Sequence, residues 1–268
     1  MNTSSNPRPR NGARMKDSTV IQVTRTQSVL HLQFSRPQKR NALNQATWEA
    51  IPRVIDEVEN DDSLSALVVS GAGEHFCAGA DISELGTVRA DPESAARYHQ
   101  MAEESMVRLA HCNKPTIAAI AGYCIGGGLE VALACDLRIM SQEARLGITA
   151  SKLGVVYGAA STRRLVDVVG PAAARFILYT ADLIGAEKAL QIGLATEVVP
   201  TGSALEVASK LAEKLAGRSP YSIRGAKTII DHYLMNRVMA DDVDIESLDR
   251  AAINSAFYKE AVKAFNSR

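Results

Sequence analysis

Three consecutive glycines followed by a lone glutamate are the residues in this sequence best suited to chemistry. The stretch GYCIGGGLEVALACD (122–136) contains the triple glycine at 126–128 and Glu130. Glu130 is the only charge among the 21 residues between Lys114 and Asp136. An isolated carboxylate among apolar residues costs several kcal/mol unless something compensates it, so Glu130 is a candidate functional residue.

The spacing places a backbone donor and an acid–base group on the same side of a helix. Glycines allow a tight turn and a close approach of the backbone to a ligand. The helix that follows begins with unpaired N–H groups and a partial positive charge. Glu130 lies three residues after Gly127, so its side chain points to roughly the same face as the Gly127 N–H. Such a pair can stabilise an oxyanion or enolate and move a proton.

Other glycine motifs fit the sequence less well. A dinucleotide-binding loop needs Gly-x-Gly-x-x-Gly with an acidic residue about 20 positions further on, and a P-loop needs Gly-Lys-Ser or Gly-Lys-Thr. Neither pattern occurs at this point of the sequence. A close-packed turn before a helix, with a glutamate that only favours the helix N-terminus, stays open as a structural interpretation.

A cysteine nucleophile is a second chemical interpretation. The segment at 122–126, with Cys124 at its centre, has the Gly-x-nucleophile-x-Gly form of a nucleophile elbow. Asp136 and His232 follow in the chain order of a hydrolase triad. A Cys-nucleophile hydrolase would leave the remaining glycines and Glu130 without a role, so we expect glutamate chemistry instead.

The composition is that of an ordinary soluble globular protein. The chain has 268 residues, 46% hydrophobic and 22% charged, and its 30 Lys and Arg balance its 30 Asp and Glu. This balance gives no positive field for nucleic acid or a membrane surface, so a small substrate or a protein partner is expected. The four cysteines form no Cys-x-x-Cys pair and the five histidines show no metal-ligand spacing. We therefore expect free thiols in a reducing compartment and no metal site.

The N-terminus and the apolar stretches indicate a cytoplasmic protein without a membrane span. Residues 1–18 are polar and lack the apolar core of a signal peptide, so a disordered tail is expected. The strongest candidate for a span is residues 122–136, but its three glycines and its charge argue against one.

Hydrophobic patterns predict strands that alternate with helices. TVIQV and LHLQF alternate like a hairpin joined by TRTQS, while ALVVS, TIAAIA and LRIM are typical of buried strands. A helix is predicted after Asn44, with Pro52 tolerated best in a first turn or at a kink. Beyond Pro200 the pattern is only helical. These patterns divide the chain into a tail at 1–18, a core at 19–200 and a C-terminal helical region at 201–268.

Several further motifs accompany the glycine segment in a fixed order. SRPQKRNALN (35–44) is similar to an Arg-Pro-x-x-x-Asn-Ala-Leu segment, HFCAGADI (75–82) to a first oxyanion loop, and AGYCIGGGLEVALACDLRI to a second oxyanion loop with its catalytic helix. LGVVYGAASTRRL, AEKALQIGLATEVVP and KEAVKAF resemble later core segments and a C-terminal helix. From about residue 20 to residue 268, the chain resembles the enoyl-CoA hydratase/isomerase (crotonase) superfamily.

The resemblance implies an α/β fold, a spiral of repeated ββα units with a helical C-terminal region that builds trimers, often paired as hexamers. It implies an acyl-CoA thioester whose carbonyl oxygen lies between the N–H groups of Ala80 and Gly127, and no cofactor beyond the coenzyme A of the substrate. Two amide donors suit a thioester enolate because its negative charge gathers on oxygen. The residues implied along the coenzyme A path are Lys39, Arg40, Ala42, Ala78, Asp81, Ile82 and Gly126, with Phe265 and Arg268 at a subunit boundary.

The sequence departs from the superfamily at one catalytic position. The hydratases that it resembles carry a second glutamate about twenty residues after the first, and Ala150 stands there in this chain. Loss of an acid or base group typically costs ~10²–10⁴ in rate. The resemblance therefore implies addition of water to a 2-enoyl-CoA with Glu130 as the single acid and base.

Other activities stay open at this point. ITASKLGVVY, with Thr149 and Tyr157, resembles the loop of methylmalonyl-CoA decarboxylases, in which enolate stabilisation matters more than a second acid. Tyr157 is then a catalytic candidate, with plain packing as its structural alternative. The Ala80-Asp81 pair resembles the hydratases instead, and isomerases of the superfamily usually keep the second acid, so isomerisation ranks below hydration. A non-catalytic acyl-CoA-binding homologue is the remaining interpretation. The acyl chain length has no readable code in the sequence.

Overall fold

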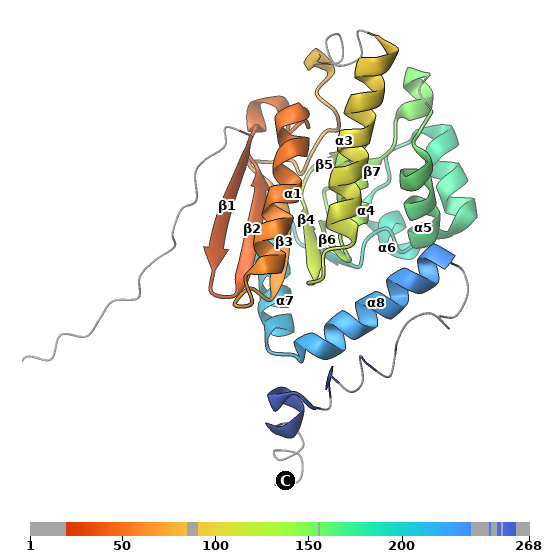
Figure 1. Ribbon diagram of the computed structural model, residues 1–268. Coiled ribbons are helices and arrows are strands. Elements are labelled where there is room, and N and C mark those ends of the chain that lie inside the picture. Colours follow the sequence, from red (N-terminus) through yellow and green to blue (C-terminus); the bar gives the residue numbers. More distant parts are fainter. Residues whose placement is uncertain are drawn as a thin grey trace, which may run out of the picture.

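The computed structural model describes residues 20–84, 91–154, 156–236, 247, 251–252 and 254–260. The predicted tail at 1–18 and the predicted contact residues Phe265 and Arg268 lie outside these residues. A six-stranded sheet forms the centre, in the order β1-β2-β3-β4-β6-β8 (Figure 1). Its strands are β1 (Ile21–Thr26), β2 (Val29–Phe34), β3 (Ala66–Gly71), β4 (Thr116–Ile120), β6 (Leu137–Ser141) and β8 (Glu197–Val199).

Helices cover both faces of this sheet. Every residue of β4 is buried, which is typical of a parallel strand packed on both sides. One face packs against α1 (Gln45–Asn60) and α3 (Pro92–Ala110). The other face packs against α7 (Ala204–Ala216) (Figure 1), whose buried alanines belong to the same hydrophobic cluster as residues of the strands. The first helix after Pro200 therefore completes the core layer, although the sequence pattern assigns it to the C-terminal region.

The predicted hairpin is confirmed, with a tighter turn. β1 and β2 pair antiparallel, from Ile21 opposite Phe34 to Thr26 opposite Val29. The strand continues through the first part of the predicted TRTQS link, so only Gln27 and Ser28 form the turn. All other pairs of the main sheet are parallel.

Helix α1 keeps a proline in its interior. Asn44 caps the helix, because its side chain accepts a hydrogen bond from the Thr47 N–H at 3.0 Å. Pro52 lies in the middle of the helix and not in the first turn, so the Trp48 carbonyl four residues earlier has no helical N–H donor. The Ser105 hydroxyl of α3 donates to that carbonyl at 2.6 Å. The neighbouring helix therefore satisfies the acceptor that the proline leaves free.

Two short strands and a helix hold the glycine segment. β5 (Tyr123–Ile125) pairs in parallel with β7 (Arg145–Gly147), and α4 (Gly127–Ala134) follows β5 directly. Three-residue strands carry too little periodicity to be recognised, so the sequence predicts neither of them. This small sheet lies beside the main one and fixes the point at which α4 begins.

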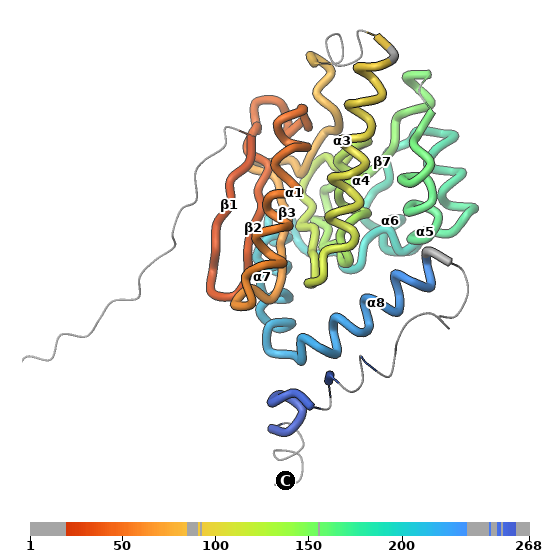
Figure 2. The backbone as a smooth tube through the Cα atoms, viewed as in Figure 1, coloured from red at the N-terminus to blue at the C-terminus, as the bar shows by residue number. Residues whose placement is uncertain are grey.

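Further helices lie outside these layers. They are η1 (Pro37–Lys39), η2 (Ala150–Leu153), α5 (Ala159–Thr180), α6 (Ala186–Gln191) and α8 (Pro220–Asn236). In Figures 1 and 2, α8 lies across the lower end of the layers. Lys227 of α8 forms an ion pair with Asp136 at 2.6 Å, and the second Asp136 oxygen accepts the Thr116 N–H at 2.8 Å. A division of the chain near residue 200 stays a prediction.

Leu67 in the central strand β3 provides a test of the core packing. Leu67 is 0% exposed, so we expect Leu67→Ala to lower the free energy of unfolding by about 2–5 kcal/mol through lost contacts and a residual cavity. Urea unfolding followed by circular dichroism measures this. The control is Leu205→Ala on the outer side of α7, where the side chain is 38% exposed and the expected loss is below about 1 kcal/mol. Equal losses in the two variants would contradict this packing.

Candidate active site

Two loops that lie far apart in the sequence meet at the start of α4. The Cys77 N–H donates to the Tyr123 carbonyl at 2.9 Å, and the Ile125 N–H donates to the Cys77 carbonyl at 2.9 Å. A Cβ atom on Gly128 would lie 2.4 Å from that same Cys77 oxygen. Glycine is therefore required at this position, because the two backbones approach more closely than any side chain allows.

This contact brings the amides of Ala80 and Gly127 close together. A Cβ atom on Gly127 would lie 3.8 Å from the Ala80 nitrogen, and one on Gly79 would lie 3.7 Å from the Gly127 nitrogen. Among the hydrogen bonds of the described residues, neither amide donates to a protein acceptor. Two neighbouring free donors have the geometry of an oxyanion hole, and this role for Ala80 and Gly127 stays a prediction.

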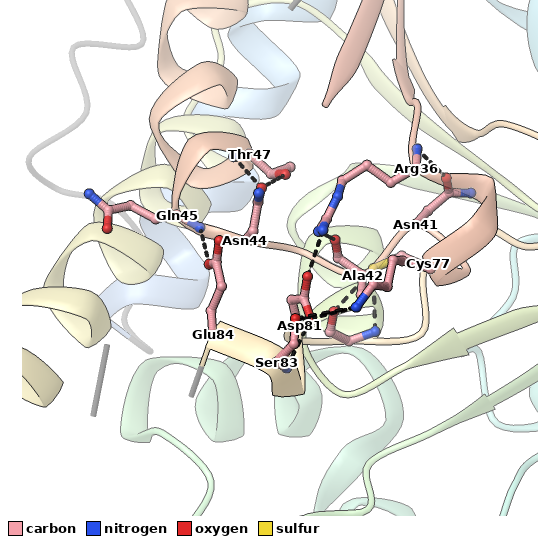
Figure 3. A network of polar contacts seen from close by, with 12 residues as sticks. Arg36, Asn41, Ala42, Asn44, Gln45, Thr47, Cys77, Asp81, Ser83 and Glu84 are labelled. Carbon is pink, nitrogen blue, oxygen red and sulfur yellow. Dashed lines mark hydrogen bonds and ion pairs between the residues drawn. The ribbon is translucent and has the colours of Figure 1, made fainter. Parts of the chain in front are cut away.

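A buried ion pair holds the first loop in shape (Figure 3). Arg36 Nη2 contacts Asp81 Oδ2 at 2.6 Å, and Arg36 Nη1 donates to the Ala42 carbonyl at 2.6 Å. Ser83 donates to the other Asp81 oxygen from its backbone N–H at 3.0 Å and from its hydroxyl at 2.6 Å. Burial alone would raise the pKa of Asp81, but the hydrogen bonds from Ser83 and Arg36 outweigh it and lower this pKa to about 2. The sequence gives Arg36 no role, because its partner lies 45 positions further on.

The predicted coenzyme A residues come from the same region but differ in exposure. Asp81 is turned inward to Arg36, whereas Ile82 is 75% exposed. Lys39 lies within 3.9 Å of Asp81 and keeps much of its side chain in solvent, and the Arg40 guanidinium lies 5.7 Å from the centre of the Tyr123 ring. A backbone hydrogen bond connects two further members of the predicted set, because the Ala78 N–H donates to the Arg40 carbonyl at 3.0 Å. Ala42 is buried. Gly126 has a left-handed φ of 53°. Contact of these residues with coenzyme A stays a prediction.

Glu130 lies on the first turns of α4, as the spacing predicts. Burial raises the pKa of its carboxyl above the ordinary value of 4.5, and this effect is partly offset by the Ser161 hydroxyl, the Tyr157 hydroxyl and the positive charge of Arg164. A raised pKa brings a carboxyl closer to the range in which it can both accept and return a proton near neutral pH. The hydroxyls of Ser161 and Tyr157 and the charge of Arg164 therefore compensate part of the cost of burying the Glu130 carboxylate.

Tyr157 and Arg164 both act on Glu130. The buried hydroxyl of Tyr157 and the buried Nη1 of Arg164 make no hydrogen bond of ordinary length to any described residue. The Tyr157 hydroxyl is nevertheless close enough to Glu130 to lower its pKa as a donor, and Arg164 acts on Glu130 through its charge. Burial and the nearby Glu130 charge raise the pKa of Tyr157 well above 10.0, so this hydroxyl stays protonated as a donor. Ser161 and Arg164 were missed by the sequence analysis, because nothing in AASTRRL links them to a residue on another helix.

The position expected to carry the second acid in related hydratases is Ala150 in this chain. Ala150 begins η2 and packs against the main hydrophobic cluster. Among the described residues, the groups that shift the pKa of Glu130 include no second carboxyl group.

The cysteine interpretation is wrong on physical grounds. Cys124 is fully buried in β5, and burial raises the pKa of its thiol well above 9.0. A cysteine nucleophile needs a reachable thiolate, which this environment disfavours. The part of the chain that the structure describes also holds no group of three metal-ligating side chains, and no helix long and apolar enough to cross a bilayer.

Comparison with known proteins decides the family. A family model described as enoyl-CoA hydratase/isomerase matches residues 24–268. The chain belongs to this family. It is 38% identical over 205 residues to the 2,3-dehydroadipyl-CoA hydratase of Escherichia coli, covering 76% of this chain and 79% of that protein. It is 30% identical to the peroxisomal Delta(3,5)-Delta(2,4)-dienoyl-CoA isomerase of Arabidopsis thaliana, with 80% and 81% covered.

Solved structures of the family share the fold. The crystal structure of an enoyl-CoA hydratase from Bacillus anthracis matches with a TM-score of 0.83 at 31% identity, covering 92% of this chain and 96% of that one. The protein therefore has the crotonase-type α/β fold and is an enzyme of this family, most consistent with a hydro-lyase. A non-catalytic homologue is not supported.

Gly127→Ala tests the space between the two amides. The new methyl group would make ordinary contacts of 3.4–3.8 Å with Leu43, Trp48 and Ala80, so the fold should survive. It would, however, occupy the position between the donors, and we expect enoyl-CoA turnover to fall by about 10²–10³ with an unchanged melting temperature. Steady-state kinetics and thermal denaturation measure this. Gly128→Ala is the contrast, because its clash with Cys77 should lower the melting temperature itself. Full activity of Gly127→Ala would rule out this donor pair.

Tyr157→Phe tests the coupling to Glu130. The hydroxyl lowers the pKa of Glu130 because it stabilises the carboxylate, so its removal should move this pKa further upward. NMR titration of ¹³C-labelled glutamate carboxyls measures the shift, and the signal missing in Glu130→Gln assigns the residue. Tyr179→Phe, at a hydroxyl on the surface, should leave the titration unchanged. An unmoved Glu130 titration in Tyr157→Phe would mean that the two groups are not coupled.

Proposed function

We propose that this enzyme adds water to the double bond of a 2-enoyl-CoA thioester. The observation that carries the proposal is the placement of Glu130, in largely buried surroundings, on the helix whose first N–H group lies beside that of Ala80. An acid–base group and two free amide donors converge there, as addition to an unsaturated thioester requires.

The proposed reaction uses one carboxyl group twice. The Glu130 carboxylate takes a proton from water while the water oxygen bonds to the β-carbon, and the electron pair of the double bond moves to the thioester oxygen. The amides of Ala80 and Gly127 donate hydrogen bonds to the resulting enolate oxygen. In a desolvated site such bonds stabilise the enolate by several kcal/mol. The protonated Glu130 then returns its proton to the α-carbon, so that one water molecule has been added.

Tyr157 and Ser161 assist Glu130 in this scheme. Their hydroxyls favour the carboxylate form and so keep the base available against the effect of burial. Tyr157 stays protonated itself, so it acts as a donor to the carboxylate or to the attacking water and does not act as a base. Its role in catalysis is part of the proposal.

The remaining assignments follow the family. Coenzyme A enters as part of the substrate, no other cofactor is required, and its path runs along the loops that carry Lys39, Arg40 and Ile82. We propose a homotrimer or a hexamer as the assembly. Exposed apolar side chains on and near α5 support a subunit contact, among them Phe176 and Tyr179.

Decarboxylation of a methylmalonyl-type thioester is the second candidate. The observation that favours it is Ala150, because decarboxylation needs enolate stabilisation but no second acid. In that reaction the bond to the carboxylate breaks, CO₂ leaves, and the enolate takes its proton from Glu130.

Glu130→Gln tests the role of the carboxyl group in either reaction. The amide keeps the shape but cannot accept the proton, so we expect the rate to fall by at least about 10²–10⁴ while the affinity for an acyl-CoA survives. Purified protein is incubated with crotonyl-CoA and with methylmalonyl-CoA, and the products are followed by mass spectrometry. Gain of one water supports hydration, and loss of one CO₂ supports the second candidate.

Glu143→Gln is the matched control. Glu143 is exposed in the turn between β6 and β7, and this variant should keep the wild-type rate. If Glu130→Gln turned over either substrate as fast as this control, Glu130 could not be the acid and base.

A further inference from the structure

A large cavity begins one helical turn beyond Glu130. It has a volume of about 580 Å³ and lies among the ends of α3 and α4, the start of α5, and α8. Leu133 and Ala134 of α4 form part of its wall, three and four residues after Glu130. Leu133 and Ala134 lie on the same side of α4 as Gly127 and Glu130, and they follow Gly127 by about 9–10 Å along the helix, so an acyl chain of that length whose thioester is bound at Gly127 would reach the cavity. No step of the proposed reaction uses this space.

Four cationic side chains line the cavity, and three of them have polar partners within the protein. Lys227 forms an ion pair with Asp136 at 2.6 Å. Arg163 lies 3.7 Å from Asp167 and donates to the Leu234 carbonyl at 2.5 Å. Arg138 donates to the carbonyls of Leu194 at 2.9 Å and Cys135 at 2.8 Å. The fourth cation is Arg164. Across the described residues, its guanidinium has neither a hydrogen bond nor a close ion pair, and its Nη1 is buried without a partner.

An unpaired guanidinium in this position needs an explanation. Burial lowers the pKa of Arg164, yet arginine stays charged in proteins, so a part-buried guanidinium without a close partner is unfavourable. The acidic groups that act on it, Glu130, Glu103 and Asp167, do so only at longer range. The cavity wall beside it is mostly apolar, with Val107, Leu133 and Ile230 among the lining residues. A mostly apolar cavity with one unpartnered cation in its wall suits a methylene chain that ends in an anion.

We propose that Arg164 binds a carboxylate at the far end of the acyl group, and that the substrate class is the coenzyme A thioesters of unsaturated dicarboxylic acids. This inference rests on the proposed function, because it assumes that the thioester is bound at Gly127. The planar guanidinium matches a carboxylate with two parallel hydrogen bonds, which a neutral chain end cannot form. Arg164 is thus a specificity-determining residue, and Glu130 remains the group that moves the proton.

Paired substrates of equal length test the proposal. We compare 2-hexenoyl-CoA with 5-carboxy-2-pentenoyl-CoA, and the eight-carbon pair in the same way, using the full-length enzyme. A buried hydrogen bond to a charged group changes affinity by about ten- to a hundredfold, so kcat/KM should favour the carboxylated member of at least one pair by that factor. Equal or higher kcat/KM for the neutral member at both lengths would overturn the proposal.

Arg164→Met assigns the preference to this residue. The variant keeps the length of the side chain and removes its charge, and the ratio of kcat/KM within the preferred pair should fall to near one. The ratio cancels any general loss of activity, including a change in the pKa of Glu130. Arg163→Met is the matched control, since it removes the neighbouring charge, which Asp167 already pairs, and it should keep the ratio. A preference that survives in Arg164→Met would overturn the proposal.

Binding separates this inference from the proposed reaction. Calorimetry with saturated thioesters, hexanoyl-CoA against 5-carboxypentanoyl-CoA, needs no turnover. Tighter binding of the carboxylated ligand to the wild type, lost in Arg164→Met, supports the inference even if neither enoyl-CoA is hydrated, in which case only the proposed reaction fails. Equal binding of the two ligands, together with turnover of both enoyl-CoA substrates, would contradict the inference about Arg164 but would still support the proposed reaction.

Discussion

The close approach of two backbones at Gly128 and Cys77 is the constraint on which the site depends. The α4 segment can lie against the loop after β3 only because Gly128 has no side chain, since a Cβ atom there would lie 2.4 Å from the Cys77 oxygen. Hydrogen bonds on both sides of Cys77 fix the register of this contact. The amides of Ala80 and Gly127 are neighbours as a consequence, and their relative position does not rely on any side-chain rotamer. Preorganised donors of this kind need little rearrangement when charge develops.

The surroundings of Glu130 combine two opposed effects. Burial disfavours the carboxylate, while the hydroxyls of Ser161 and Tyr157 and the charge of Arg164 favour it. The net effect is a raised pKa, so burial outweighs the three polar groups. A carboxyl group held in this balance can accept a proton and give it back, which a fully solvated or a tightly ion-paired carboxylate does less well. Asp81, only a loop away, is the contrast, because its hydrogen bonds outweigh burial and lower its pKa to about 2.

The polar groups around Glu130 all come from the segment after β7. Tyr157 precedes α5, and Ser161 and Arg164 lie on its first turns, so the position of this helix against α4 sets both the acidity of the carboxyl group and the wall of the neighbouring cavity. The ion pair between Lys227 and Asp136 ties α8 to the end of α4, and both residues line that cavity. The environment of Glu130 and the shape of this cavity thus depend on packing between helices rather than on the sheet.

The sequence by itself determined the elements whose signal is local. The β1–β2 hairpin, helix α1 after Asn44, the buried strands, and Glu130 on the face of Gly127 all follow from periodicity and glycine conformation, which need only near neighbours in the chain. Only the tertiary structure decided which distant residues meet: Arg36 with Asp81, Ser105 with the carbonyl that Pro52 leaves free, and Ser161 and Arg164 with Glu130. Such contacts join residues tens of positions apart and leave no local pattern. The three-residue strands β5 and β7 belong to this second group as well, because a strand of that length exists only through its partner.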